Sequence, residues 1–450
     1  MNLKTFKIGG IHPKENKLTF NVETIAATLP PKAVFMLSQH IGAPAKPVVQ
    51  RGDRVKVGTL LAEAGGFVSA PIYSSVSGTV SKIDSVFDAS GYRKPAIIID
   101  VEGDDWEDCI DRSDKLETME EHPELNSEEI INRIKIAGVT GMGGAGFPTF
   151  IKLTPPPTAK AECVIINGVE CEPYITADYR LMMEHTEEIL VGLKLLMAAV
   201  KVDCGYIGIE ENKPEAIRLF QDKTKNDSRI EIVPLKQKYP QGGEKQLVDA
   251  VINRQVPAPP AIPVNVGAVV QNVGTAFAVY QAVMKHKPLL ERYTTVTGKQ
   301  VKNPGNFLVR IGTPMRDLID ACGGLPEGDN KILAGGPMMG KALPTEDVPV
   351  CKGTNSITIL SGDDAKRKVP QPCIRCGKCV TVCPMGLEPF LLATASAKQK
   401  WDLVEKEDIT SCIACGCCQF TCPAHRPLLD NISLGKAAVM GIIKTRNAKK

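Results

Sequence analysis

Two copies of one cysteine pattern constrain the fold of this 450-residue chain more than any other feature of its sequence. Both copies read C-x2-C-x2-C-x3-C-P, and they begin at Cys373 and at Cys412. This spacing holds cubane [4Fe-4S] clusters in two-cluster iron–sulfur domains. Three closely spaced thiolates on a tight loop reach three iron corners, while the fourth cysteine, followed by proline, points to the other cluster.

The spacing therefore assigns four cysteines to each of two clusters. The first cluster takes Cys373, Cys376, Cys379 and Cys422, and the second takes Cys412, Cys415, Cys418 and Cys383. Cys417 fits neither loop. Zinc ribbons also use C-x2-C pairs, but four sulfurs complete a zinc site, and here two quartets interleave. We expect a two-cluster, ferredoxin-like domain over residues 373–430.

Length and charge place the rest of the chain among ordinary soluble globular proteins. The length predicts about three domains, and a net charge of +3 excludes a nucleic-acid binder built on bulk charge. Thirteen acidic residues against two basic ones between Glu102 and Glu129 predict a solvated connector over 102–125. The uncharged run 255–284 contains four prolines and several amides, so a transmembrane helix is not expected there.

The N-terminal part, residues 1–101, has the pattern of a small β domain. Residues 1–47 read as an irregular lead because of their prolines, and 48–100 as short strands cut by glycines, which predicts a barrel or sandwich. The stretch 69–80 resembles the hairpins of lipoyl and biotinyl carriers. No lysine that could carry such a cofactor lies between Lys56 and Lys82, so we expect a structural or docking role.

Residues 126–290 alternate between helical and strand patterns. Asn126 is placed to cap a helix that ends near Gly138. Strands are expected at 163–167, 206–209 and 229–235, and helices at 178–200 and 214–223. This alternation predicts a Rossmann-like α/β domain with a parallel sheet and a ligand site beyond the carboxyl ends of its strands.

A smaller mixed domain is expected to follow, over residues 291–345. It contains a predicted hairpin around 303–306, a helix between Pro314 and Gly323, and a strand at 331–334. We interpret it as a β-grasp-like domain of mixed, mainly antiparallel strands. Residues 346–372 are expected to be a linker, and 431–450 a C-terminal helix with a frayed basic tail.

A glycine-rich segment opens the α/β region and offers unobstructed backbone N–H groups. It runs from Gly141 through Gly143, Gly144, Gly146 and Phe147, and Lys152 follows. Phosphate binding is the natural use of such a loop. Taken alone, the loop matches neither common nucleotide-binding pattern, and a structural turn is an open alternative.

Four segments in the same order resemble the family of the NADH- and flavin-binding subunit of respiratory complex I. They are the glycine loop, Asn167–Pro173, Tyr239–Glu244 and Gln271–Thr275. Together with the N-terminal domain and the cysteine region, they make nearly the whole chain similar to the C subunits of Rnf electron-transport complexes, the ferredoxin:NAD oxidoreductases. The start Gly9-Gly10-Ile11-His12-Pro13 also resembles that family.

The resemblance implies roles for individual residues. Those implied to bind flavin are Gly141, Gly143, Gly144, Gly146, Phe147, Lys152, Asn167, Glu170, Glu172, Asn272 and Thr275, and those on the nicotinamide side are Tyr239 and Glu244. Singly, each has another interpretation: Glu170 and Glu172 as loop acids, Tyr239 as a core ring, and Asn272 as a helix cap. The chain departs from the complex I pattern at Met142, Val169 and Gly243, where that family has arginine, aspartate and glutamate.

The implied function is electron input to a membrane-associated, ion-translocating complex. The implied cofactors are FMN, NAD(H) and two [4Fe-4S] clusters, since flavin exchanges both hydride and single electrons. The implied partners are an iron–sulfur B subunit, integral membrane subunits and, indirectly, ferredoxin, with no nucleic acid. These partners would hold the chain at the cytoplasmic face of the bacterial membrane. Two alternatives stay open: a flavin and iron–sulfur cobalamin reductase of a microcompartment, and a non-enzymatic electron-transfer scaffold.

Overall fold

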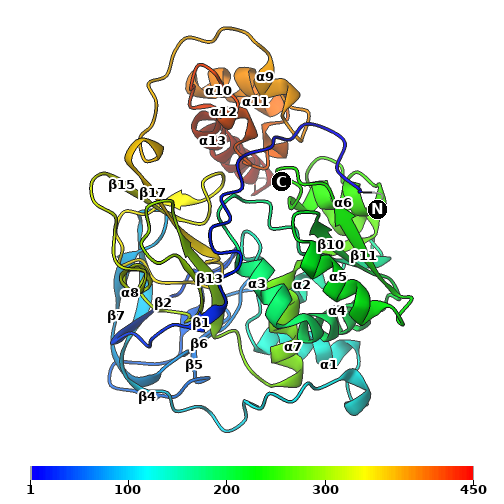
Figure 1. Cartoon of the computed structure of the whole chain (residues 1–450), viewed down its shortest axis with the longest axis vertical. Helices are drawn as coiled ribbons and strands as arrows, with labels where there is room; N and C mark the ends of the chain where they lie inside the picture. Colours follow the sequence, from blue (N-terminus) through cyan, green and yellow to red (C-terminus); the bar gives the residue numbers. More distant parts are fainter. Residues whose placement is uncertain (1–2, 449–450) are drawn as a thin grey trace.

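The computed structural model describes residues 3–448 of the chain. In Figure 1 an α/β domain occupies the right-hand side, two β-rich parts occupy the left, and a small helical domain lies above them. The N-terminal segment runs along the base of the helical domain before it reaches the β-rich side. The predicted order of four different folding units is confirmed.

The first β-rich part is a barrel sandwich of two antiparallel sheets. Its sheet orders are β2-β8-β7-β4 and β3-β5-β6. The strands are β2 (Lys32–Met36), β3 (Lys46–Pro47), β4 (Arg54–Val55), β5 (Leu60–Glu63), β6 (Ile72–Tyr73), β7 (Ser77–Phe87) and β8 (Arg93–Gly103). The expectation that residues 1–47 are wholly irregular is wrong, because β2 and β3 belong to this unit and the buried Ala33 and Phe35 of β2 contribute to its core.

The α/β domain contains one parallel sheet of order β11-β10-β9-β12. Its strands are β9 (Cys163–Asn167), β10 (Gly205–Glu210), β11 (Ile230–Leu235) and β12 (Ala268–Asn272). Its helices are α1 (Ser127–Ile136), α2 (Thr149–Lys152), α3 (Ala177–Glu184), α4 (Thr186–Val200), α5 (Pro214–Thr224), α6 (Glu244–Ile252) and α7 (Val273–Met284), with the 3-10 turn η2 (Pro263–Val266) before β12. The parallel sheet is as predicted.

Local signals in this domain are mostly confirmed. The side chain of Asn126 accepts hydrogen bonds from the backbone N–H groups of Glu128 and Glu129, both at 3.0 Å, and so caps α1. The single helix expected over 178–200 is instead two helices, α3 and α4, separated at His185. The uncharged run 255–284 forms η2, β12 and the almost fully buried α7.

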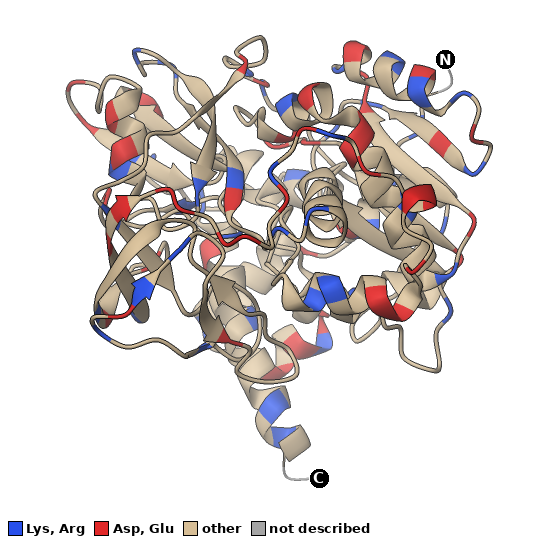
Figure 2. Cartoon of the chain, turned by 90° about the horizontal axis from the view of Figure 1, so that it is seen from below, with Lys and Arg blue, Asp and Glu red and all other residues tan. Residues whose placement is uncertain are grey.

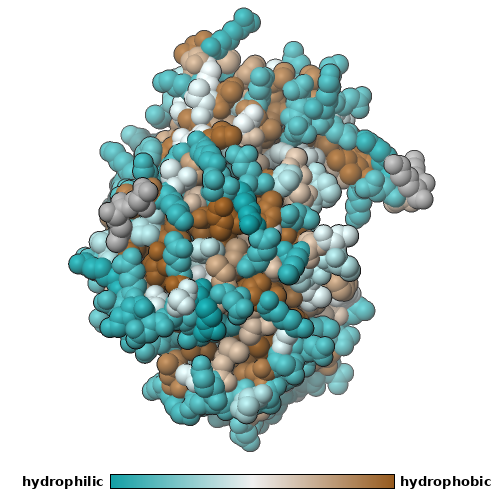
Figure 3. All heavy atoms as spheres, turned by 90° about the vertical axis from the view of Figure 1, so that its right-hand side faces the viewer, coloured by the Kyte–Doolittle hydropathy of each residue, from teal (hydrophilic) through white to brown (hydrophobic). Residues whose placement is uncertain are grey.

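No helix among the described residues is both long and apolar enough to span a membrane. On the face shown in Figure 3, hydrophobic side chains lie scattered among hydrophilic ones.

The acidic connector runs over the surface with one 3-10 turn, η1 (Met119–Glu121). It is fastened at two points. Asp111 accepts a hydrogen bond from Lys285 at 2.6 Å, and Asp104 pairs with Arg310 at 2.8 Å. The connector thus follows the surface between the barrel and the α/β domain, as expected for solvated chain.

The second β-rich part is a mixed sheet of order β1-β14-β13-β17-β15-β16. Its elements are β1 (Thr24–Ala26), β13 (Glu291–Thr297), β14 (Gly305–Arg310), α8 (Met315–Ala321), β15 (Asn330–Ala334), β16 (Lys341–Ala342) and β17 (Ser356–Ser361). The hairpin, helix and strand are as predicted. The linker expected over 346–372 differs, because β17 and the turn η3 (Gly362–Asp364) lie within it and β17 pairs with both β13 and β15.

The helical domain follows a shorter linker. Its elements are α9 (Lys378–Thr381), α10 (Pro389–Ala397), α11 (Trp401–Lys406), η4 (Ile409–Ser411), α12 (Cys417–Phe420) and α13 (Leu428–Ala448). The tail expected to fray from Lys444 is helical as far as Ala448, and residues 449 and 450 lie outside the described residues. Figure 2 shows the end of α13 projecting from the molecule with basic side chains.

A glycine sets the approach of two helices that carry the central site. A Cβ atom on Gly192 of α4 would overlap the carbonyl of Ala276 on α7. We expect Gly192→Ala to lower the free energy of unfolding by about 2 kcal/mol, because overpacking of a rigid backbone contact costs about 1–3 kcal/mol. The helical control Gly441→Ala, which has open space around it, should be neutral or stabilising by up to about 1 kcal/mol. Urea unfolding followed by circular dichroism measures both, and equal effects would contradict this packing account.

Candidate functional site

The parallel sheet places its ligand site between β9 and β12. From β9 the chain proceeds to β10 and β11 on one side of the sheet, and β12 lies on the other side. Ligands of open parallel sheets bind beyond the strand ends at such a switch point. Asn167 and Asn272 are the last residues of β9 and β12, and they are register partners. The two predicted flavin-site asparagines therefore lie side by side where the topology favours a ligand.

The glycine loop lies against the same strand ends. The backbone N–H of Met142 donates to the hydroxyl of Thr275 at 3.0 Å, which ties the loop to the first turn of α7. The N–H of Gly141 donates to the carbonyl of Phe147 at 2.8 Å and closes the loop. A Cβ atom on Gly143 would lie 2.9 Å from the Cβ of Asn272, so this glycine permits close packing.

Part of the loop faces open space. A Cβ atom on Gly144 would have no heavy atom within 4 Å, and Gly146 has a φ of +71°, which favours glycine. The structure thus brings together a bare stretch of backbone and the amides of two strand ends.

Charged and amide side chains surround this loop. The ammonium of Lys152 donates to the carboxylate of Glu244 at 2.5 Å and to the carbonyl of Val270 at 3.1 Å. Asn167 Nδ2 donates to the carbonyl of Gly242 at 2.9 Å. Four of the segments singled out in the sequence therefore converge on one place.

Asn272 is both a helix cap and a site residue. Its Oδ1 accepts from the N–H of Gly274 at 2.8 Å, and its Nδ2 donates to Oδ2 of Asp178 at 2.6 Å. Burial raises the pKa of the Asp178 carboxyl. The cap interpretation and the site interpretation of Asn272 are therefore compatible.

The residues present fit a polar, phosphorylated ligand such as FMN. Several buried polar atoms near the loop have no hydrogen-bond partner within residues 3–448, and they are Thr140 Oγ1, Thr149 Oγ1 and Gln271 Nε2. Orphaned buried polar groups are rare unless water or a ligand satisfies them. Backbone N–H groups of the loop and the first turn of α7 favour an anion.

Two predicted flavin residues are already engaged by the protein. The buried carboxylate of Glu170 accepts from the N–H groups of Asp178 at 2.7 Å and Tyr179 at 3.3 Å, which caps α3. Burial raises the Glu170 pKa to about 7, opposed by the ammonium of Lys17. Glu172 accepts from the N–H groups of Met338 at 2.6 Å and Met339 at 3.1 Å, so it joins the α/β domain to the mixed sheet.

Tyr239, expected on the nicotinamide side, contacts the helical domain. It is 2% exposed, and its hydroxyl donates to the carbonyl of Cys415 at 2.8 Å. Its backbone pairs with Ile11 through hydrogen bonds of 2.8 and 2.9 Å. The neighbouring Gly10 N–H donates to the carbonyl of Val382 at 2.9 Å. The N-terminal segment and Tyr239 thus hold the α/β domain against both cysteine motifs.

A cavity of about 370 Å³ lies in the helical domain beside Tyr239's partner Cys415. Cys383, Cys412, Cys415 and Cys418, which we call the inner set, all line it. Among the described residues no three His, Cys, Asp or Glu side chains gather as tightly as a single metal ion requires. The inner set surrounds a larger space with apolar walls, which fits a cubane cluster. Cys417 is fully buried and lies on the same wall.

The remaining four cysteines, Cys373, Cys376, Cys379 and Cys422, form the outer set. Cys373 and Cys376 are exposed, while Cys379 and Cys422 are half-buried. The two motifs have the same loop geometry. Positive φ values occur at Arg375 and Gly377 in the first motif and at Ala414 and Gly416 in the second, and α9 and α12 follow at equivalent positions. This duplication is what two similar cluster loops require.

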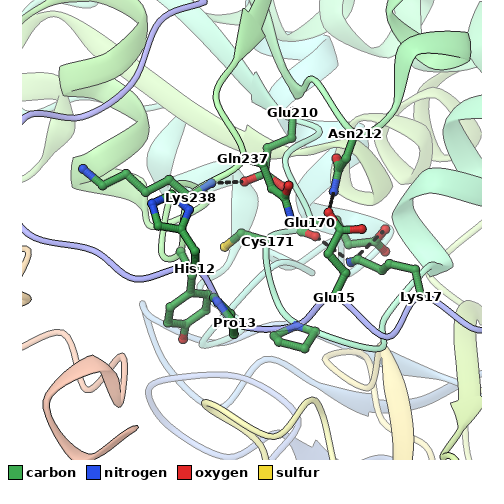
Figure 4. A pocket seen from close by; sticks show the side chains of 12 residues that line it. His12, Pro13, Glu15, Lys17, Glu170, Cys171, Glu210, Asn212, Gln237 and Lys238 are labelled. Carbon is green, nitrogen blue, oxygen red and sulfur yellow. Dashed lines mark hydrogen bonds and ion pairs between the residues drawn. The ribbon is translucent and has the colours of Figure 1, made fainter. Parts of the chain in front are cut away.

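A second, polar cavity of about 300 Å³ lies beyond the ends of β10 and β11 (Figure 4). The N-terminal residues His12, Glu15 and Lys17 cover it, and the buried Glu210 lies at its floor. The ammonium of Lys17 donates to three backbone carbonyls at 2.6 to 3.0 Å. This cavity is packed with internal charge pairs and lies away from the glycine loop.

Sequence reasoning missed the residues that reach the site from distant segments. Arg292 comes from β13 and Lys17 from the N-terminal lead, and both are buried against the α/β domain. No motif surrounds either residue. A charged residue inside an otherwise buried strand pattern, as in the run after Leu290, is the one available signal for Arg292.

Comparison with known families matches each structural unit. Residues 4–104 match the RnfC barrel sandwich hybrid domain, 134–281 the Nuo51 FMN-binding domain, 293–342 the SLBB domain and 365–425 a 4Fe-4S dicluster domain. A flavin-binding α/β domain joined to a dicluster domain defines the class: a flavin- and iron–sulfur-containing oxidoreductase subunit.

Known relatives are similar over most of the chain. The C subunit of the Na(+)-translocating ferredoxin:NAD(+) oxidoreductase complex of Acetobacterium woodii is 43% identical over 98% of both chains. The C subunit of the proton-translocating complex of Clostridium ljungdahlii is 43% identical over 90% of this chain and 87% of that one. The C subunit of the ion-translocating oxidoreductase complex of Rhodobacter capsulatus is 41% identical over 87% and 75%. The chain belongs to the family of Rnf complex C subunits.

The burial of Glu170 predicts a pH dependence of stability. The folded protein keeps a proton on Glu170 up to about pH 7, while the unfolded chain loses it near 4.5. The folded state binds more protons between these values, so the free energy of unfolding falls as the pH rises through this window. Glu170→Gln should flatten that slope, and the control Glu187→Gln, half exposed on α4, should not. Urea unfolding at pH 5, 6, 7 and 8 measures the slope; an unchanged slope in Glu170→Gln refutes the assignment.

Proposed function

We propose that this chain passes electrons between NAD(H) and partner subunits through FMN at the glycine loop and two [4Fe-4S] clusters in the helical domain. The observation that carries the proposal is the contact of Tyr239 with Cys415. Through this contact the flavin-binding domain lies directly against a cavity lined by four predicted cluster ligands. FMN, when bound, supplies the exchange between a two-electron hydride carrier and one-electron carriers.

The inner and outer cysteine sets have different surroundings, which suggests an order. The inner set is buried or half-buried and lies against the α/β domain, while two cysteines of the outer set are exposed. We assign the inner cluster to the flavin side and the outer cluster to the partner side. The partner is an iron–sulfur or membrane subunit of the same complex, as the names of the relatives suggest.

The residues of this chain hold and orient the reacting groups. The glycine loop, Asn167 and Asn272 bind the phosphate and ribityl groups, and Lys152 neutralises negative charge. Glu244 is 41% exposed at the start of α6 and is held by Lys152, so it is free to accept hydrogen bonds from a nicotinamide nucleotide. Tyr239 acts as a positioning residue for the inner cluster rather than as a nicotinamide contact.

The N-terminal domain favours the Rnf function over the cobalamin reductase. Residues 4–104 match the barrel sandwich domain of RnfC, and the relatives at 41–43% identity carry Rnf-type names. The peripheral location at the cytoplasmic face of the membrane follows from membership of such a complex. The structured glycine loop with its tie to Thr275 argues against an empty scaffold.

The direct test is anaerobic addition of NADH to the purified, iron-loaded protein. Bleaching of the flavin absorbance followed by cluster EPR signals is expected. An intact, iron-loaded protein that retains and binds no flavin contradicts the proposal.

A variant of Glu244 tests the nucleotide side. Glu244→Gln should raise the KM for NADH about tenfold, because losing a hydrogen bond to a charged group costs about 1.5–3 kcal/mol. Reduction of the clusters by dithionite should be unchanged. The control Glu215→Gln, half exposed on α5, should keep the wild-type KM. Stopped-flow reduction of the flavin at several NADH concentrations gives both values; a wild-type KM in Glu244→Gln removes Glu244 from the nucleotide site.

A further inference from the structure

A buried arginine from outside the α/β domain reaches the glycine loop. Arg292 lies on β13 of the mixed sheet and is 4% exposed. Its Nη2 donates to the carbonyl of Met142 in the glycine loop at 3.4 Å, and its Nε donates to the carbonyl of Thr354 at 3.2 Å. Its Nη1 lies 3.4 Å from the position of a Cβ atom on Gly274, in the first turn of α7. The guanidinium therefore lies where the loop and the helix start meet.

The charge on Arg292 has no direct counter-ion in the protein. Both of its hydrogen bonds go to uncharged carbonyls, and within residues 3–448 no carboxylate oxygen lies within 4.0 Å of it. Burying a cation without a partner is strongly unfavourable. Burial lowers the Arg292 pKa to about 10, so the group stays charged at neutral pH, with Asp178 as the opposing influence.

Asp178 does not remove the need for an anion. It forms no ion pair with Arg292 within 4.0 Å, and its Oδ2 is bonded to the amide of Asn272. The glycine loop and the N-terminal turn of the 12-residue helix α7 lie on the same side. Both present backbone N–H groups, which favour negative charge. A cation, a helix start and a glycine loop thus converge without any anionic side chain in contact with the guanidinium.

We propose that Arg292 supplies the counter-charge for the phosphate of the flavin bound at the glycine loop. This inference rests on the proposed function, because it assumes flavin at that loop. It makes the mixed sheet a contributor to the flavin site rather than a separate unit. Its ligand chemistry is a phosphate monoester, so the contribution of Arg292 depends on the phosphate and not on the ring.

The comparison of FMN with riboflavin tests this directly, because riboflavin has the same ring and ribityl chain without the phosphate. The full-length, iron-loaded protein is freed of flavin and titrated with each ligand, and quenching of flavin fluorescence reports binding. Wild type should bind FMN more tightly than riboflavin. Arg292→Met should weaken FMN binding about tenfold or more, the loss expected for a charge-assisted phosphate contact, and leave riboflavin binding unchanged.

Two further variants separate charge from packing. Arg292→Lys keeps the charge but not the planar fork, so FMN binding should fall by less than in Arg292→Met. The control Arg310→Met removes a mostly buried arginine from β14 of the same sheet, where it pairs with Asp104 and Glu291, and should preserve the preference for FMN.

Several outcomes overturn the inference. Equal weakening of FMN and riboflavin in Arg292→Met would show a purely structural role, and no change in either would show no role. If Arg292→Met does not fold, the same comparison with Arg292→Lys decides. Wild type that binds neither flavin refutes the proposed function itself, whereas wild type that prefers FMN with an indifferent Arg292 refutes only this inference.

Discussion

The structure depends on one interface, where the loop at Tyr239 meets the inner cysteine set. A flavin and an iron–sulfur cluster can exchange electrons only if the protein holds them close and fixed. Here the hydroxyl of Tyr239 bonds to the carbonyl of Cys415, while Gly10 bonds to the carbonyl next to Cys383. The two ties reach both cysteine motifs, so the cavity between the motifs is fixed relative to the α/β domain.

Glycine at the N-terminus makes this interface possible. Gly9 has a φ of +67°, and a Cβ atom on it would lie 2.6 Å from the backbone of Cys383. Any side chain at this position would displace a predicted cluster ligand. The segment that begins the chain therefore acts as part of the cluster environment, although it is more than 350 residues away in sequence.

Buried charge is the second constraint on the α/β domain. Burial raises the pKa values of Asp178, Glu170, Glu172 and Glu210, and each accepts hydrogen bonds from the protein. These carboxyls connect the sheet ends to the N-terminal lead and the mixed sheet. Their cost is offset by these contacts, and the arrangement fixes the domains around the flavin site.

Much of this could be predicted from the sequence, because the signals are local. The cysteine spacing, the Asn126 cap and the strand at Cys163–Asn167 each depend on a few neighbouring residues, and the structure has the cap and the strand where they were expected. The match to a 4Fe-4S dicluster domain confirms the cluster domain. The break at His185 and the strand β17 were missed because long-range packing decides them.

The site was predicted less completely for the same reason. The glycine loop and the two asparagines were found from short motifs, but the contacts of Glu170, Glu172 and Tyr239 depend on segments far away in sequence. Arg292 reaches the carbonyl of Met142 from another domain, and no local pattern marks it. Residue type and spacing predict which groups gather, whereas their individual partners follow from the packing of whole domains.

Rapid-freeze EPR after mixing with NADH tests the central claim that the inner cluster lies between the flavin and the outer cluster. Cys373→Ser, which removes an outer ligand, assigns the two signals. The inner signal should appear first in wild type and should form at the wild-type rate in Cys373→Ser. An outer signal that appears first, or an inner cluster that stays oxidised in Cys373→Ser, would contradict this order.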